Sequence, residues 1–158
     1  PVGLPLSISD MTMPLRHLLV LAPLFATPLH AQSDVQPPAK AATHFATQHP
    51  NAVVKEWELR KRNYRVEYTE KGVEYDSYYT PEGAWVRTEQ EIGPKDLPTT
   101  VTAALKAGKY STWRVDDVEK HTTPEHAALY KVKVEKLGKV MELYHTPDGK
   151  LIKEKEDR

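Results

Sequence analysis

The sequence of 158 residues contains no cysteine. This absence excludes a disulfide framework and a thiol nucleophile, and it also excludes a lipid-modified cysteine behind an export signal. The folded chain must therefore be stabilised by the burial of side chains, without covalent cross-links.

The chain also lacks the short motifs that accompany common enzyme activities. Behind Ala31 the only serines are Ser33, Ser77 and Ser111, and none of them stands in a G-x-S-x-G motif. No glycine-rich phosphate loop and no dinucleotide-binding fingerprint is present. Because no nucleophile, acid and base can be assembled into a site, we predict that the protein has no catalytic residues, is not an enzyme and uses no cofactor.

An excess of charge of either sign is missing as well. The chain carries 22 Lys plus Arg and 22 Asp plus Glu, which gives a formal net charge of zero. Neutrality argues against long-range attraction to nucleic acid or to an anionic membrane. The short basic run Arg60–Asn63 is therefore expected at a solvated hairpin tip, and no nucleic-acid partner is predicted.

An apolar run near the start is too short to span a bilayer. It extends from Leu18 to Ala26, follows Arg16, and is followed by "TPLHA", which ends at Ala31. This order of charge, apolar run and small residue is typical of a secretory signal peptide. We predict a signal peptide over residues 11–31, an upstream extension over 1–10, no membrane span, and a periplasmic or secreted protein.

The rest of the sequence contains a repeated pattern. Residues 64–83, "YRVEYTEKGVEYDSYYTPEG", align without a gap with residues 130–149, "YKVKVEKLGKVMELYHTPDG". The identical pairs are Tyr64/Tyr130, Val66/Val132, Gly72/Gly138, Tyr78/Tyr144, Thr80/Thr146, Pro81/Pro147 and Gly83/Gly149. These identities exceed what chance supplies and indicate an internal duplication. An insertion near residues 121–126 predicts a longer first hairpin loop in the second copy.

Each copy shows the period-two alternation of β-strands. Tyr64, Val66 and Tyr68 fall on one side of the first of these strands. Gly72 interrupts the run at a turn, and "TPEG" and "TPDG" place proline and glycine at the positions that β-turns favour. Both copies are therefore expected to form consecutive antiparallel hairpins, with a further strand ahead of them.

A helix is expected ahead of each set of strands. One lies between Pro38 and Pro50, and the other begins near Asp96 as N-cap and ends at Gly108. The predicted fold is α+β, a tandem repeat of a helix plus a four-stranded antiparallel meander, with repeats over residues 32–94 and 95–158. Both helices should pack on one face of the sheet, which leaves the other face open to solvent or a partner.

The histidines do not predict a metal site. His44 and His49 are five residues apart, as are His121 and His126. This spacing differs from the i, i+4 spacing that puts two ligands on one helix face, and in a strand it places the side chains on opposite faces. No metal is therefore expected, and His145, which occupies the position of Tyr79, is expected to pack rather than to bind metal.

Aromatic residues on the polar side of the strands are the best candidates for a binding surface. Tyr78 and Tyr144 should point away from the helices, and Trp85 is expected as their neighbour. Exposed aromatic rings on rigid strands are typical of protein interfaces. The alternative is that these rings pack against a neighbouring strand or against the other copy of the repeat.

Four stretches of the chain resemble the PepSY-like, β-lactamase-inhibitor-like periplasmic proteins. They are "HPNAVVKEWE", "YRVEYTEKGVEYDSYYTPEGAWVRTE", "LPTTVTAALK" and "YKVKVEKLGKVMELYHTPDGKLIKEK". The resemblance implies a helix packed on a curved antiparallel sheet, and a role in binding or inhibiting another protein such as a peptidase.

Two functions are left open by these observations. The first is an exported, non-enzymatic binding module that is inhibitor-like and has another exported protein as its partner. The second is a binder of a small apolar ligand that sits between helix and sheet, which predicts a pocket in place of a flat aromatic surface.

Overall fold

The computed structural model describes residues 35–157. The elements are α1 (Ala39–Gln48), β1 (Val53–Arg60), β2 (Asn63–Glu70), β3 (Val73–Tyr79), β4 (Trp85–Glu91), a 3₁₀ turn η1 (Pro94–Asp96), α2 (Thr99–Ala107), β5 (Arg114–Thr122), β6 (Leu129–Lys136), β7 (Lys139–His145) and β8 (Leu151–Asp157). The expected signal peptide and upstream extension lie outside the described residues.

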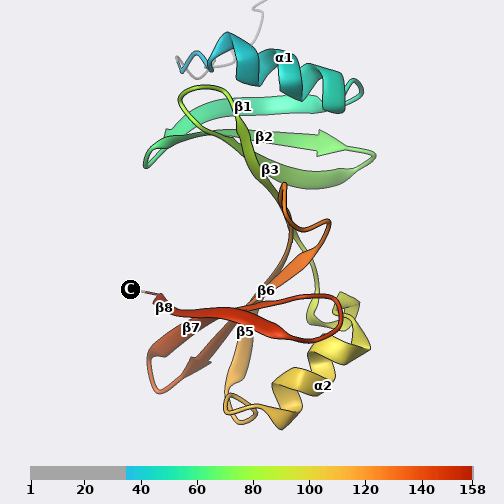
Figure 1. Ribbon diagram of the computed structural model, residues 1–158, viewed down its shortest axis with the longest axis vertical. Coiled ribbons are helices and arrows are strands. Elements are labelled where there is room, and N and C mark those ends of the chain that lie inside the picture. Colours follow the sequence, from blue (N-terminus) through green and yellow to red (C-terminus); the bar gives the residue numbers. More distant parts are fainter. Residues whose placement is uncertain (1–34, 158) are drawn as a thin grey trace, which may run out of the picture. The chain divides into compact units, whose positions relative to one another are not determined.

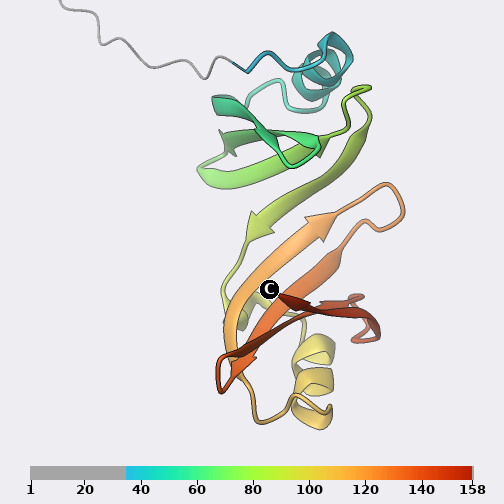
Figure 2. The same cartoon turned by 90° about the vertical axis from the view of Figure 1, so that its left-hand side faces the viewer.

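The strands form one sheet of eight, in chain order from β1 to β8 (Figure 1). Every neighbouring pair is antiparallel, including β4 and β5, which join the two sets of hairpins (Figure 2). The fold is therefore α+β with an antiparallel sheet and two helices, as the sequence predicts. Residues 61–62 connect β1 to β2, whereas residues 123–128 connect β5 to β6, so the second of these loops is the longer, as expected.

Two apolar cores lie under the two helices. The core under α1 is largely aromatic and consists of Ala41, Phe45, Val66, Tyr68 and Tyr79, with Trp57, Tyr64, Tyr75 and Trp85 packed against it. The core under α2 is aliphatic and consists of Leu97, Val101, Val118, Val132, Val134, Met141 and Leu143. The β4–β5 register pairs Thr88 with Thr122, and Thr122 lies four residues along β5 from Val118, so both cores lie on the same face of the sheet.

A glycine turn lies against the start of each helix. Gly83 has φ +81° and an added Cβ there would come within 2.8 Å of Lys40, while Gly149 has φ +88° and an added Cβ would come within 2.6 Å of the Thr100 carbonyl oxygen. Positive φ and close approach both require glycine at these turns. The turns therefore fix where α1 and α2 rest on the sheet.

One predicted boundary is wrong. Helix α2 begins at Thr99 with Pro98 at the N-cap position, and no side chain caps it. Asp96, expected as the cap, ends η1, where its Oδ2 accepts a hydrogen bond of 3.2 Å from the Gly93 amide. The cause is Pro98, which disfavours helical geometry at the residue before it.

Candidate functional site

The sheet face opposite the helices carries the candidate site. Its residues alternate with the buried ones, so Arg65 and Glu67 of β2 point away from the core that holds Val66 and Tyr68. On this open face a cleft of about 710 Å³ contains both Tyr78 and Tyr144. The two tyrosines named from the sequence therefore line one cleft, although they lie on strands β3 and β7.

The Tyr78 ring lies under a cation. The guanidinium carbon of Arg87 is 3.7 Å from the ring centroid, and Arg87 Nε donates a 2.5 Å hydrogen bond to Glu89 Oε1. Burial raises the pKa of the Tyr78 hydroxyl above its ordinary value, and the negative charge of Glu89 raises it further. Tyr78 is therefore a neutral, half-buried ring whose position is fixed by its neighbours.

Tyr144 is held in a similar way on β7. Its hydroxyl donates a 3.0 Å hydrogen bond to Glu142 Oε2, and its ring meets the edge of the His121 ring at 6.0 Å between centroids. Lys153 Nζ lies 5.2 Å from the ring centroid. Burial, followed by the charge of Glu142, raises the pKa of the Tyr144 hydroxyl.

The third residue named from the sequence, Trp85, lies on the opposite face. A bulge in β4 pairs Tyr78 with Arg87 but Tyr79 with Trp85, so Trp85 shares the helix side with Tyr79. Its ring stacks on His44 at 6.4 Å, and its Nε1 donates a 3.2 Å hydrogen bond to Thr88 Oγ1. The expectation that Trp85 neighbours the two tyrosines is therefore wrong, because simple alternation does not account for the inserted residue.

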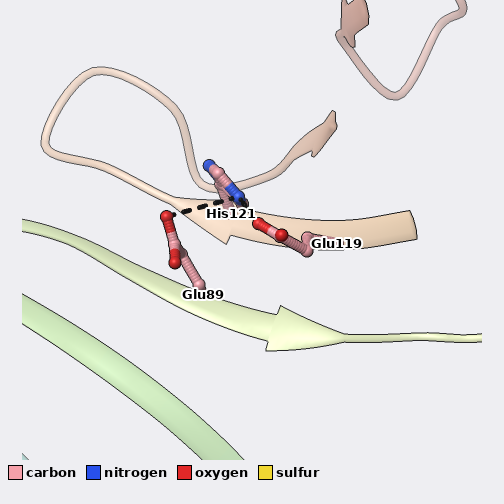
Figure 3. Close-up of side chains that lie close together, drawn as sticks. All are labelled: Glu89, Glu119 and His121. Atoms are coloured by element: carbon pink, nitrogen blue, oxygen red, sulfur yellow. Dashed lines mark hydrogen bonds and ion pairs between the residues drawn. The ribbon is translucent and has the colours of Figure 1, made fainter. Parts of the chain in front are cut away.

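Between the tyrosines the structure brings together Glu89, Glu119 and His121 (Figure 3). Glu89 and His121 are paired directly across β4 and β5, and Glu119 precedes His121 by two residues on the same face. His121 Nε2 is 2.5 Å from Glu119 Oε2 and 3.6 Å from Glu89 Oε1. The histidine side chain is only 5% exposed, and the two carboxylates beside it are partly buried, with Glu89 16% and Glu119 19% exposed.

Glu119 keeps its charge despite this burial. Burial alone would raise the pKa of the carboxyl, but hydrogen bonds from His121 and Lys131 outweigh it and lower the pKa to about 2. Lys131 Nζ donates a 2.7 Å hydrogen bond to Glu119 Oε1. At neutral pH Glu119 is therefore a carboxylate that is held between two donors.

The three ligand atoms of Glu89, Glu119 and His121 lie within 4.8 Å of one another, so they could hold a cation. The carboxylates already bind Arg87 and Lys131, with which a metal would compete. Sequence reasoning missed this group because it looked for paired histidines. The spacing Glu119-x-His121 on a strand was the available signal, but the partner Glu89 is known only from the β4–β5 pairing.

An acidic cleft adjoins the cluster. It has a volume of about 300 Å³ and its wall includes the carboxylates of Glu67, Glu74, Asp76, Glu89, Glu91, Asp117 and Glu119. Burial and the neighbouring Glu119 raise the pKa of Asp117. Burial also raises the pKa of Asp76, even though Arg65 Nη1 donates a 2.9 Å hydrogen bond to it. The cations paired with these seven carboxylates are Lys55, Arg65, Arg87 and Lys131, so this part of the open face keeps an excess of negative charge, which favours a cationic group.

The site offers little for nucleophilic catalysis. Within residues 35–157, the His121 ring is hydrogen-bonded to the Glu119 carboxylate, the Glu89 carboxylate lies 3.6 Å from Nε2, and no hydroxyl group donates to the ring. A histidine that activates a nucleophile needs a hydroxyl or thiol within hydrogen-bond reach. The arrangement is suited to binding a charged group.

The fold has relatives among solved structures. A BLIP-like protein from Bacteroides fragilis is 29% identical, with 77% of this chain and 87% of that chain covered and a TM-score of 0.68. A DUF2874 family protein from Bacteroides ovatus is 26% identical over 77% and 89% of the two chains, with a TM-score of 0.69. A protein from Bacteroides eggerthii described as "putative periplasmic" has the same fold, with 20% identity, 77% and 90% coverage and a TM-score of 0.67.

Two sequence comparisons and the properties of the helices give three further findings. The comparison with curated proteins gives no match. In the described part of the chain no helix is both long and apolar enough to cross a membrane. The sequence model of the family "Putative beta-lactamase-inhibitor-like, PepSY-like" matches residues 69–153, which is more than half of the chain, and the chain therefore belongs to this PepSY-like family.

Proposed function

We propose that this protein is an exported, non-enzymatic binding module, inhibitor-like in its action, that holds another exported protein against its open sheet face. The observation that carries this proposal is the placement of Tyr78 and Tyr144 in one cleft of about 710 Å³. Trp85 is not part of the proposed surface, because it packs under α1.

The two rings have the properties of interface anchors. Each sits on a strand and is fixed by a charged neighbour, Arg87 over Tyr78 and Glu142 at the Tyr144 hydroxyl. A ring whose position is already fixed loses little conformational entropy when a partner covers it. Buried aromatic anchors of this kind dominate the binding energy of many interfaces.

The charge of the open face indicates what the partner presents. The acidic cleft beside Tyr78 complements a Lys or Arg side chain, so we infer that the partner inserts a basic residue there and covers the tyrosines with apolar atoms. Binding should therefore weaken as the salt concentration rises, because screening reduces the attraction between exposed charges.

Family membership and sequence patterns support the rest of the proposal. The family is described as inhibitor-like, and one structural relative is described as periplasmic, which supports export and a protein partner. We also infer a tandem repeat of α-β-β-β-β units over residues 32–94 and 95–158. The shared turn residues and the order of one helix and four strands in each half support this duplication.

The experiment uses the protein as bait in a periplasmic extract, with Tyr78→Ala, Tyr144→Ala and, as a matched control, Tyr110→Ala on the helix side. We expect the same captured protein to be lost with the first two variants and kept with the control. Each loss should be about 2 kcal/mol or more, which is roughly a thirtyfold change in affinity. Thermal melts of all variants accompany the capture.

Two outcomes would overturn the binding surface. One is equal capture by all variants and the wild type. The other is a melt that collapses by about 3 to 5 kcal/mol in Tyr78→Ala and Tyr144→Ala, which would make these rings structural.

A second candidate function is favoured by a different observation. A cavity of about 120 Å³ lies between α2 and the sheet, and apolar side chains, among them Leu105 and Leu143, form part of its wall. This is the kind of place that a small apolar ligand would occupy.

A further inference from the structure

The cavity under α2 is close in size to a single aromatic ring. Its volume is about 120 Å³, and cavities of roughly 150 Å³ lined by apolar side chains bind benzene in other proteins. Leu151 and Lys109 at its rim are exposed, so a ligand can enter from solvent. The wall is formed by Ala104, Leu105, Gly108, Lys109, Tyr110, Leu143, His145, Gly149 and Leu151.

One buried polar ring in this wall lacks a partner. His145 is 3% exposed, and its Nδ1 is buried without a hydrogen bond. Burial lowers the pKa of the imidazole, so the ring is neutral at neutral pH and offers one donor and one acceptor. A buried polar group without a partner is unfavourable, and the ring therefore has hydrogen-bonding capacity that the protein itself does not use.

The corresponding place under α1 is filled by side chains. There the Tyr79 hydroxyl lies 3.2 Å from His44 Nδ1, and Trp85 stacks on the His44 ring at 6.4 Å between centroids. The Tyr79 phenol and the His44 imidazole therefore form a hydrogen-bonded pair beside the indole ring of Trp85, between α1 and the sheet.

The equivalent positions under α2 can be identified from the register. His145 pairs with Leu151 past a bulge, just as Tyr79 pairs with Trp85. Gly149 lies against Thr100 just as Gly83 lies against Lys40, so Thr100 is equivalent to Lys40. Ala104, four residues after Thr100, is therefore equivalent to His44, four residues after Lys40. The second half thus has alanine and leucine where the first half has two rings, and the cavity is the space that those smaller side chains leave.

Building on the second candidate function, we propose that this cavity binds a small phenol-like molecule. The ring of the ligand fills the space beside Ala104 and Leu151, and its hydroxyl hydrogen-bonds to the imidazole of His145. The ligand restores the phenol–imidazole pair of the first half with the roles exchanged, because here the protein supplies the imidazole.

The test is an NMR titration of the ¹⁵N-labelled protein with phenol and, separately, with benzene. Phenol should bind with a Kd of about 1 mM, as is reasonable for a ligand of this size, and should shift the amide signals around Ala104 and Leu151. Ala104→Phe, which fills the cavity, should abolish both titrations. Ala103→Phe, on the exposed side of the same helix turn, should leave them unchanged.

The role of His145 is tested separately. His145→Phe should weaken phenol about tenfold and leave benzene unaffected, since it removes the hydrogen bond but keeps a ring. If this variant does not fold, the ring nitrogen signals of His145 in the wild type should still move with phenol and stay fixed with benzene. Equal affinity for both ligands, with His145 signals that do not respond, would overturn the phenol proposal and leave an apolar-ligand site. Failure of both ligands to bind would overturn the second candidate function as well.

Discussion

At the scale of single residues, Glu119 has the largest effect on how the open face responds to acid. Its pKa is lowered in the fold from an ordinary 4.5 to about 2, despite burial, by hydrogen bonds from His121 and Lys131. A carboxyl with a lowered pKa stabilises the fold above its unfolded pKa, and this contribution is lost as the pH falls through the folded pKa. The stabilisation by Glu119 is therefore complete at neutral pH and disappears between about pH 4.5 and pH 2.

Replacing Glu119 tests this directly. In Glu119→Gln the free energy of unfolding should be lower than in the wild type at pH 7, and the two should converge toward pH 2, because the wild type loses its ionised partner there. Urea denaturation across this pH range measures both. Glu125→Gln, in the exposed loop between β5 and β6, is the control and should follow the wild type. A constant gap between Glu119→Gln and wild type at all pH values would contradict the assignment.

Single residues also show how far the sequence predicts the site. Alternation places Tyr78 and Tyr144 on the open face, and both line one cleft there. The same rule fails for Trp85, because a bulge adds one residue to β4 and reverses the side on which it lies. The contact of Glu89 with His121 could not be predicted, since it depends on the pairing of strands from different halves.

At the scale of elements, the turns between strands position the helices. Gly138 and Gly149 both have positive φ, at +77° and +88°, but only Gly149 lies against a helix. An added Cβ at Gly138 meets nothing within 4 Å, whereas at Gly149 it would lie 2.6 Å from the Thr100 carbonyl oxygen. Gly138 is therefore required only for its positive φ, whereas Gly149 is required both for its positive φ and for its close contact with α2.

Alanine at each position should show this difference. Gly138→Ala should cost about 1 to 2 kcal/mol from the left-handed backbone alone. Gly149→Ala should cost roughly 2 kcal/mol more, because the new methyl group displaces the first turn of α2. Chemical denaturation measures the free energy of unfolding of both variants. Equal losses of stability would mean that the start of α2 moves aside at no cost to make room for the methyl group.

The elements themselves are largely predictable from local patterns. Period-two alternation and the "TPEG" and "TPDG" turns locate the hairpins that the structure contains, with strands ending at Tyr79 and His145. The start of α2 is predicted less well. Asp96 is a favourable N-cap residue, but in the structure it belongs to η1 and accepts a hydrogen bond from the Gly93 amide. The cavity under α2 also lies beyond local patterns, since it depends on which side chains of a helix and a strand meet.

At the scale of the whole described chain, one sheet spans two separate cores. The aromatic core under α1 and the aliphatic core under α2 have no residue in common. They are joined by the β4–β5 ladder, whose register contains the four pairs Thr88/Thr122, Glu89/His121, Gln90/Lys120 and Glu91/Glu119. Because most of the buried apolar area lies within each half, each half should be able to open while the other stays folded.

Val66 and Val132 provide a matched test of this independence. They are equivalent positions on β2 and β6, and both are 0% exposed, so Val66→Ala and Val132→Ala remove the same atoms from each core. Each change should destabilise its own half by about 2 kcal/mol, through lost burial and a small cavity. Native-state hydrogen exchange should then show faster exchange in β1–β3 for Val66→Ala and in β6–β8 for Val132→Ala. Faster exchange of every strand in both variants would instead show that the β4–β5 ladder couples the cores into one cooperative unit, and a partner on the open face would then bind to a surface that cannot open in parts.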